Sequence, residues 1–129
     1  RIGDEAKTIA ERTLSIHERG VRLSGGLPAE VDQLVAIASQ RINLALDCLA
    51  RMDIEQSWTL VRADKADDVF QAILHALSTR TPDGELAVAT LIDATIALKA
   101  LKRVAERAQN LAEYVIYIIE GQDIRHNIG

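Results

Sequence analysis

Three histidines are the side chains of this chain best suited to proton transfer, phosphate transfer or metal binding. Helical di-metal carboxylate sites need an acidic residue three positions before each histidine, and neither His17 nor His75 has one. Asp123 precedes His126 at that spacing, but both lie in the polar segment after Gly121. We therefore interpret all three histidines as ordinary helix-surface or helix-end residues.

Other reactive groups give no stronger sign of catalysis. A histidine phosphotransfer bundle would need an exposed reactive histidine beside lysine and small residues, whereas His75 lies in an apolar stretch. Cys48 lies in a helix interior without a cation or helix N-terminus to activate it, which indicates a packed thiol. Gly25 and Gly26 are too few and too poorly placed for a phosphate-binding loop.

The composition predicts an all-α fold in a single domain. The chain has 129 residues, of which 48% are hydrophobic and only 3% aromatic, and it contains two prolines. The net charge of −4 comes from interspersed acids and bases, so no basic surface for nucleic acid is expected. One cysteine cannot form an internal disulfide, which favours the cytoplasm. No apolar run approaches a membrane span, and no signal peptide is evident.

Apolar periodicity predicts four long helices in an antiparallel bundle. The expected ranges are 1–24, 28–52, 53–80 and 85–120, and the connections between them are short. In the second and fourth ranges the apolar residues alternate in steps of four and three, as in a bundle seam. The first seam includes Val35, Leu49 and Met52, and the last has a cluster of small residues at Ala105, Ala108 and Ala112.

Local signals predict where these helices begin and end. Pro28 suits a first helical turn, and Asp53 followed by Gln56 resembles a capping box. Gly25 and Gly26 are expected to end the first helix, and Gly121 the last. Trp58 is interpreted as a core anchor of the third helix.

A short internal repeat links the first and last helices. Residues 1–12 match residues 103–114 at an offset of 102, with identical Arg, Ala, Ala and Glu and conservative Ile/Val, Gly/Ala, Asp/Glu and Ile/Leu pairs. We therefore interpret residues 1–24 as the last helix of an incomplete first repeat and residues 28–121 as a complete three-helix second repeat. Residues 122–129 form a polar tail.

At these residues the sequence resembles the PhoU family of phosphate-signalling proteins. The family's third helix of each repeat has a signature similar to L-E-R-I-G-D-x-A-x-N-I-A-E. Here Arg1 to Asp4, Ala6 and Ile9 to Glu11 match one copy, and Leu101, Arg103, Ala108, Asn110, Ala112 and Glu113 match the other. The run from Tyr114 to Gly121 is similar to the family's closing segment, and Ala66 to Phe70 is similar to part of its middle helix.

The resemblance implies a non-enzymatic regulator of phosphate uptake and phosphate-starvation signalling. Such proteins contact the ATPase of a phosphate ABC transporter and a sensor histidine kinase, and many form homodimers; contact with the membrane is then indirect. The alternative is a cytosolic appendage of a sodium–phosphate cotransporter or another membrane protein. A metal-dependent bundle enzyme is a third hypothesis, which the poor ligand set disfavours.

The resemblance also identifies the positions of a possible metal site. PhoU-like proteins often carry acid-x-x-x-acid motifs on the middle and last helices, and facing pairs of carboxylates bind hard cations or iron. The matching positions of the second repeat are Ala63, Asp67, Lys102 and Glu106, so two acids are missing and one is replaced by a cation. In the first repeat only Asp4 remains. We expect no multinuclear metal cluster, and expect Lys102 to pair with Asp67; Asp64 and Asp68 are expected on a solvated face.

Overall fold

The computed structural model describes residues 2–18, 30–78 and 84–128, with side chains from Val88 to Gly121 in the last range. These residues form five helices and no strand: α1 (Ile2–Glu18), α2 (Glu30–Arg51), α3 (Ile54–Val61), α4 (Ala66–Ser78) and α5 (Gly84–Ile128). The predicted all-α helical bundle is confirmed. Gly25, Gly26 and Pro28, at which helix ends were predicted, lie outside the described residues.

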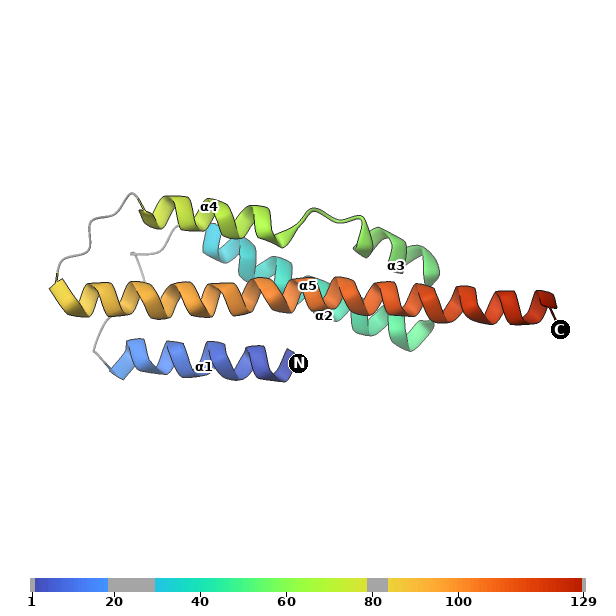
Figure 1. Ribbon diagram of the computed structural model, residues 1–129, viewed down its shortest axis with the longest axis horizontal. Coiled ribbons are helices and arrows are strands. Elements are labelled where there is room, and N and C mark those ends of the chain that lie inside the picture. The colour runs from blue at the N-terminus through green and yellow to red at the C-terminus, as the bar shows by residue number, and fades with distance from the viewer. Residues whose placement is uncertain (1, 19–29, 79–83, 129) are drawn as a thin grey trace.

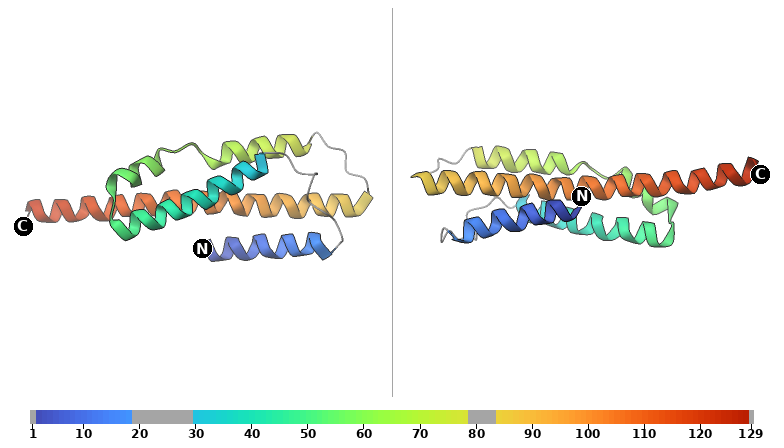
Figure 2. Two further views of the ribbon diagram at one scale, coloured as in Figure 1. Left: turned by 180° about the vertical axis from the view of Figure 1, so that it is seen from behind. Right: turned by 60° about the horizontal axis from the view of Figure 1, so that its bottom comes forward.

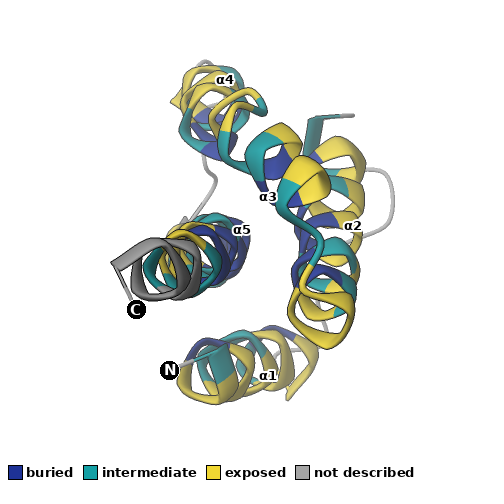
Figure 3. Cartoon of the chain, turned by 90° about the vertical axis from the view of Figure 1, so that its right-hand side faces the viewer, coloured by how far each residue is buried: buried dark blue, intermediate teal, exposed yellow. Residues whose placement is uncertain are grey.

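Helix α5 is the central rod against which the other four helices pack (Figure 1). Its 45 residues correspond to a length of about 68 Å at ~1.5 Å per residue. Helix α1 runs antiparallel to α5, and its N-terminus lies near the middle of α5 (Figures 1 and 2). Seen along the rod, α1, α2, α3 and α4 form an arc around one side of α5 and turn their buried faces toward it (Figure 3).

The core is mainly aliphatic and lies where α2, α4 and α5 meet. Its larger cluster includes Leu34, Phe70, Ile73 and Leu98, and a smaller cluster joins Ala45 and Leu60 to the alanines of α5. Ala105, Ala108 and Ala112 are completely buried, as the small-residue cluster predicted. Because a methyl group is the whole side chain there, neighbouring helices approach α5 closely and bury area along the whole seam.

Some residues of the predicted seams face outward instead. Val35 and Leu49 are exposed because α2 turns these positions away from α5 and buries Leu34 and Cys48, and Met52, which follows the last residue of α2, is exposed as well. Trp58 is half-buried rather than a core anchor, and the guanidinium of Arg62 lies 5.0 Å from its ring centroid.

The single helix predicted for residues 53–80 is wrong, because it is divided into α3 and α4. The helical ladder of α3 ends with bonds from Arg62 N to Trp58 O (3.0 Å) and from Ala63 N to Leu60 O (3.2 Å). The polar residues 62–65 then connect the two helices. Gly121 likewise does not close the last helix, since α5 continues to Ile128.

The junction between α2 and α3 follows from two local signals. Met52 adopts a left-handed backbone conformation with φ of 52°, and Asp53 N donates to Cys48 O at 3.1 Å, as in a helix-ending Schellman motif. Asp53 Oδ1 accepts from Gln56 N at 3.0 Å, so the predicted cap of α3 is confirmed. The reciprocal half of a capping box does not form, because the Asp53 N–H is bonded to Cys48.

In the part of the chain that the structure describes, no helix is both long enough and apolar enough to cross a membrane.

Candidate functional site

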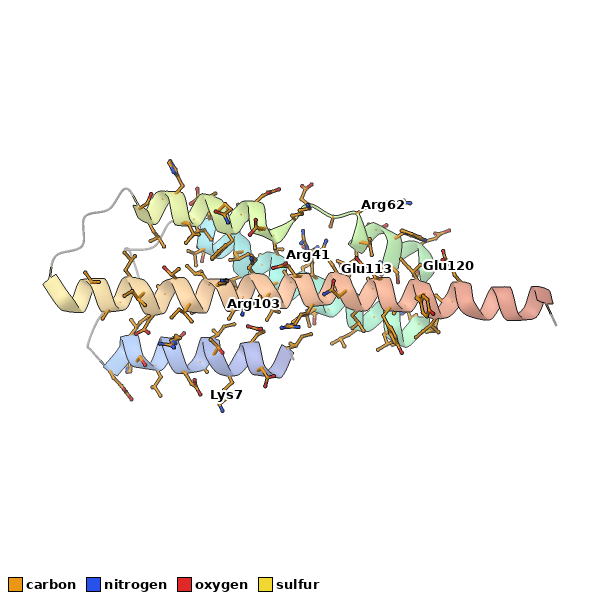
Figure 4. The ribbon with its side chains drawn as sticks, in the orientation of Figure 1. Lys7, Arg41, Arg62, Arg103, Glu113 and Glu120 are labelled. Atoms are coloured by element: carbon orange, nitrogen blue, oxygen red, sulfur yellow. The ribbon has the colours of Figure 1, made fainter. Side chains whose placement is uncertain are left out.

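The break between α3 and α4 opens a polar cavity against the middle of α5. The cavity has a volume of about 610 Å³, and its wall combines the connection, the first turn of α4 and one face of α5. Figure 4 labels Arg62 in the connection and Glu113 on α5, which both contribute to it. The remaining polar side chains of its wall are Lys65, Asp67, Glu106, Gln109 and Asn110.

Lys102 joins the two carboxylates that the resemblance singled out. Its Nζ lies 3.2 Å from Asp67 Oδ1 on α4 and 3.5 Å from Glu106 Oε1 one turn along α5. The Nζ atom also lies 5.1 Å from the centroid of the Phe70 ring. The predicted ion pair between Lys102 and Asp67 is therefore confirmed.

This cluster is partly shielded from water. The Lys102 side chain is 15% exposed, whereas both carboxylates are nearly half exposed. The lysine side chain is thus largely buried, and its ammonium lies over the aromatic ring and beside the two acids at the cavity edge. The result is a pin between α4 and α5 whose strength is limited by solvent around the carboxylates.

The residues present do not fit a multinuclear metal cluster. Such a cluster needs several carboxylates around one point, and here the Lys102 ammonium supplies the positive charge that a metal ion would supply. Asp4 is exposed on α1, and Ala63 offers no ligand atom. Within residues 2–18, 30–78 and 88–121, no three His, Cys, Asp or Glu side chains gather around a common point. Asp64 and Asp68 are exposed, in agreement with the predicted solvated face.

Gln109 fixes the shape of the α3–α4 connection from the other side of the cavity. Its Nε2 donates to Leu60 O at 3.1 Å and to Ala63 O at 3.3 Å. Carbonyl groups at the end of a helix lack their regular helical partners, so Gln109 satisfies Ala63 O and adds to the bond that Leu60 O already accepts from Ala63 N. The sequence gives no local sign of this role, because Gln109 acts on residues far away in the chain.

The sequence analysis also did not predict the ion pairs between α1 and α5. Glu5 is buried and its Oε1 lies 3.1 Å from Arg107 Nη2, while Arg12 Nη1 lies 3.0 Å from the buried Asp93 Oδ1. Ala6 is exposed on this helix, and Glu5 takes the inner position beside it. A signal was present in the spacing, since Glu5 and Arg12 are seven residues apart and therefore share a helix face.

The isolated reactive residues lie away from this cavity wall. His17 and His75 are exposed on α1 and α4, and the side chain of His126 lies outside the described residues. Cys48 is fully buried in α2, as expected for a packed thiol.

Comparison with curated proteins gives consistent matches over nearly the whole chain. It is 32% identical over 127 residues to the phosphate-specific transport system accessory protein PhoU homolog of Pseudomonas aeruginosa, which covers 98% of this chain. The chain is a homologue of PhoU proteins. The PhoU homolog of a Burkholderia species is also 32% identical, and PhoU of Escherichia coli strain K12 is 29% identical, each over 98% of this chain.

The matched region is a part of those PhoU proteins. The chain spans about half the length of the relatives it matches, namely 52% of the Pseudomonas aeruginosa protein, 54% of the Burkholderia protein and 52% of the Escherichia coli protein. No model of a known protein family matches the chain, and no solved structure gives a significant match. The resemblance to PhoU therefore rests on the curated sequences.

Proposed function

We propose that this chain belongs to a PhoU-type regulator that represses phosphate uptake and phosphate-starvation signalling through protein–protein contacts. Its partners are the ATPase of a phosphate ABC transporter and a sensor histidine kinase. The observation that carries the proposal is the similarity over 98% of the chain to proteins named phosphate-specific transport system accessory proteins.

The way polar groups are used in the cavity supports binding rather than catalysis. Lys102 is paired with two acids, Gln109 is bonded to backbone carbonyls, and Arg62 lies over Trp58. The first two pairings join α5 to α4 and to α3, and the third lies at the end of α3, whereas a catalytic group needs a free face toward its substrate. We accordingly propose that the protein is not an enzyme, that it works in the cytoplasm, and that it forms a homodimer.

The proposal is tested by recovering partners from cells. The full-length gene product carrying this sequence is tagged and purified gently from cells grown with abundant and with scarce phosphate, and co-purifying proteins are identified by mass spectrometry. We expect the transporter ATPase or the sensor kinase, in amounts that depend on phosphate. Recovery of neither protein under both conditions would contradict the proposal.

A pair of surface variants makes this experiment sharper. Tyr117 is 77% exposed on α5, and exposed aromatic side chains often anchor protein interfaces. Leu14, which is 56% exposed on α1, gives a matched control. We expect Tyr117→Ser to lower partner recovery while Leu14→Ser leaves it unchanged. Equal recovery for both variants would place the contact elsewhere on the protein.

A further inference from the structure

Arg41 is a buried cation that no described carboxylate pairs with. It lies near the middle of α2 and is only 8% exposed. Its Nη2 donates to the backbone carbonyl of Asp64, and Nη1 is buried without a hydrogen-bond partner. Burial lowers the pKa of the Arg41 guanidinium, and the Asp64 carboxylate opposes this shift only in part. A buried charge with a neutral acceptor and an unused donor is costly for a fold to retain.

A second cavity adjoins this guanidinium on the side of the α3–α4 connection away from α5. Its volume is about 720 Å³, and Arg41, Arg62 and Lys65 contribute three cationic side chains to its wall. The other side chains that line it are Gln33, Ile37, Ala63, Asp64, Asp68 and Val69. The two carboxylates in this wall are exposed, and that of Asp64 offsets the effect of burial on Arg41 only in part. The wall therefore carries one more cation than anions. Figure 4 shows Arg41 beside the connection that forms part of this wall.

We propose that this second cavity binds a small tetrahedral oxyanion, with Arg41 as the principal recognition residue. A guanidinium presents a planar fork of donors that matches two oxygens of a phosphate or sulfate. The Arg41 Nη1 atom has no acceptor in the protein, so it can donate a hydrogen bond to an oxygen of such a ligand. The anion compensates the buried charge, and Lys65 at the rim adds attraction.

The site would couple ligand binding to the shape of the bundle. Arg41 already holds the Asp64 carbonyl, so one side chain joins α2 to the connection and reaches the cavity. The connection is shared with the cavity that contains Asp67 and Glu106, which lies on its other side. An oxyanion at Arg41 would thus order residues 62–65, whose backbone also carries the Gln109 bond. The proposal does not rest on the proposed regulatory function, because it concerns the isolated protein.

The test is a titration followed by nuclear magnetic resonance. Sodium phosphate, sodium sulfate and sodium acetate are added separately to the labelled protein at constant ionic strength. We expect saturable shifts with phosphate and sulfate in the backbone amides of Arg62 to Lys65 and of α2 around Arg41. Acetate is expected to bind about tenfold more weakly. Acetate binding as tight as phosphate would overturn the choice of a tetrahedral ligand.

Two variants at the site and one control assign the binding to Arg41. Arg41→Met removes the charge at similar length, and we expect about tenfold weaker phosphate binding. Arg103→Met removes an exposed arginine of α5 away from the cavity, and it should change the affinity less than about twofold (Figure 4). Unchanged affinity in a folded Arg41→Met protein would overturn the proposal.

The remaining outcomes also decide the question. If Arg41→Met does not fold, Arg41→Lys keeps the charge without the planar fork and should weaken binding severalfold. If neither variant folds, saturable shifts of the wild-type protein confined to the connection and α2 support the site, and shifts spread over the whole surface contradict it. Absence of any saturable shift up to about 10 mM phosphate would overturn the proposal outright. None of these results depends on recovery of the transporter ATPase or the kinase.

Discussion

Glu5 on α1 and Arg107 on α5 form an ion pair of 3.1 Å, and their separation of 102 positions in the sequence equals the offset of the internal repeat. The two residues therefore occupy equivalent positions of the repeated motif. Since α1 and α5 run antiparallel, equivalent positions can meet only near a local two-fold axis (Figure 1). The repeated segments thus pack on each other about this pair, and α5 is the one described helix that α1 contacts.

This ion pair is expected to contribute to stability through its burial. Replacing Glu5 by Gln leaves the Arg107 guanidinium without its carboxylate, so we expect the free energy of unfolding to fall by about 2 kcal/mol. A double-mutant cycle with Arg107→Met, read by urea unfolding, should give a coupling energy above about 1 kcal/mol. Lys7→Met, at an exposed position of the same helix, serves as the control and should change stability little. Additive effects at the two positions would contradict this view of the interface.

The Lys102 cluster is expected to behave as a structural pin. Lys102→Met should lower the free energy of unfolding by about 1 kcal/mol, because it leaves Asp67 and Glu106 without their shared cation. Lys99→Met, on the exposed face of α5, provides a matched control with little expected effect. Thermal unfolding at low and at high salt measures the difference, which should shrink as salt screens the pair. An equal loss in both variants would show that the cluster adds nothing.

Metal analysis tests the same residues independently. We expect Asp67→Ala to leave the metal content of the purified protein nearly unchanged, because Asp67 pairs with a lysine. Inductively coupled plasma mass spectrometry of the wild-type and variant proteins, purified without chelators, measures this directly. A stoichiometric metal signal that disappears with Asp67 would contradict the assignment.

Gln109 is expected to be essential for the shape of the α3–α4 connection. Gln109→Glu keeps the size of the side chain but replaces the amide donor by an acceptor that faces the carbonyls of Leu60 and Ala63. We expect a loss of about 2 kcal/mol in unfolding free energy. Asn110→Asp, a matched amide-to-acid change at an exposed neighbouring position, should cost much less. Hydrogen exchange of residues 62–65 should accelerate in the first variant and not in the second.

The strained residue between α2 and α3 offers a stabilising change. Met52 has a φ of 52°, a conformation that costs an L-residue about 1 kcal/mol and costs glycine almost nothing. Met52→Gly should therefore raise the free energy of unfolding by up to about 1 kcal/mol. Met52→Ala retains the Cβ atom and the strain, so it should not stabilise the protein. Chemical unfolding of the three proteins measures the order of their stabilities.

Several features of the fold and the site were predictable from the sequence alone. The alanines of α5, the Asp53 cap and the Lys102–Asp67 pair follow from periodicity, local chemistry or the PhoU resemblance. These features depend on residues that are close in sequence or on a pattern shared with related proteins. Such features can be predicted without knowing how segments that are distant in the sequence pack together.

The tertiary structure alone decided where the third predicted helix breaks and which faces become buried. Residues 62–65 leave the helix because donors from two other helices, Gln109 of α5 and Arg41 of α2, satisfy the freed carbonyls. Glu5 is turned inward because it forms an ion pair there with Arg107 of α5, the antiparallel neighbour of α1. The burial of a backbone polar group or of a charge is favourable only when the group is paired inside the protein. The partners of these groups lie far away along the chain.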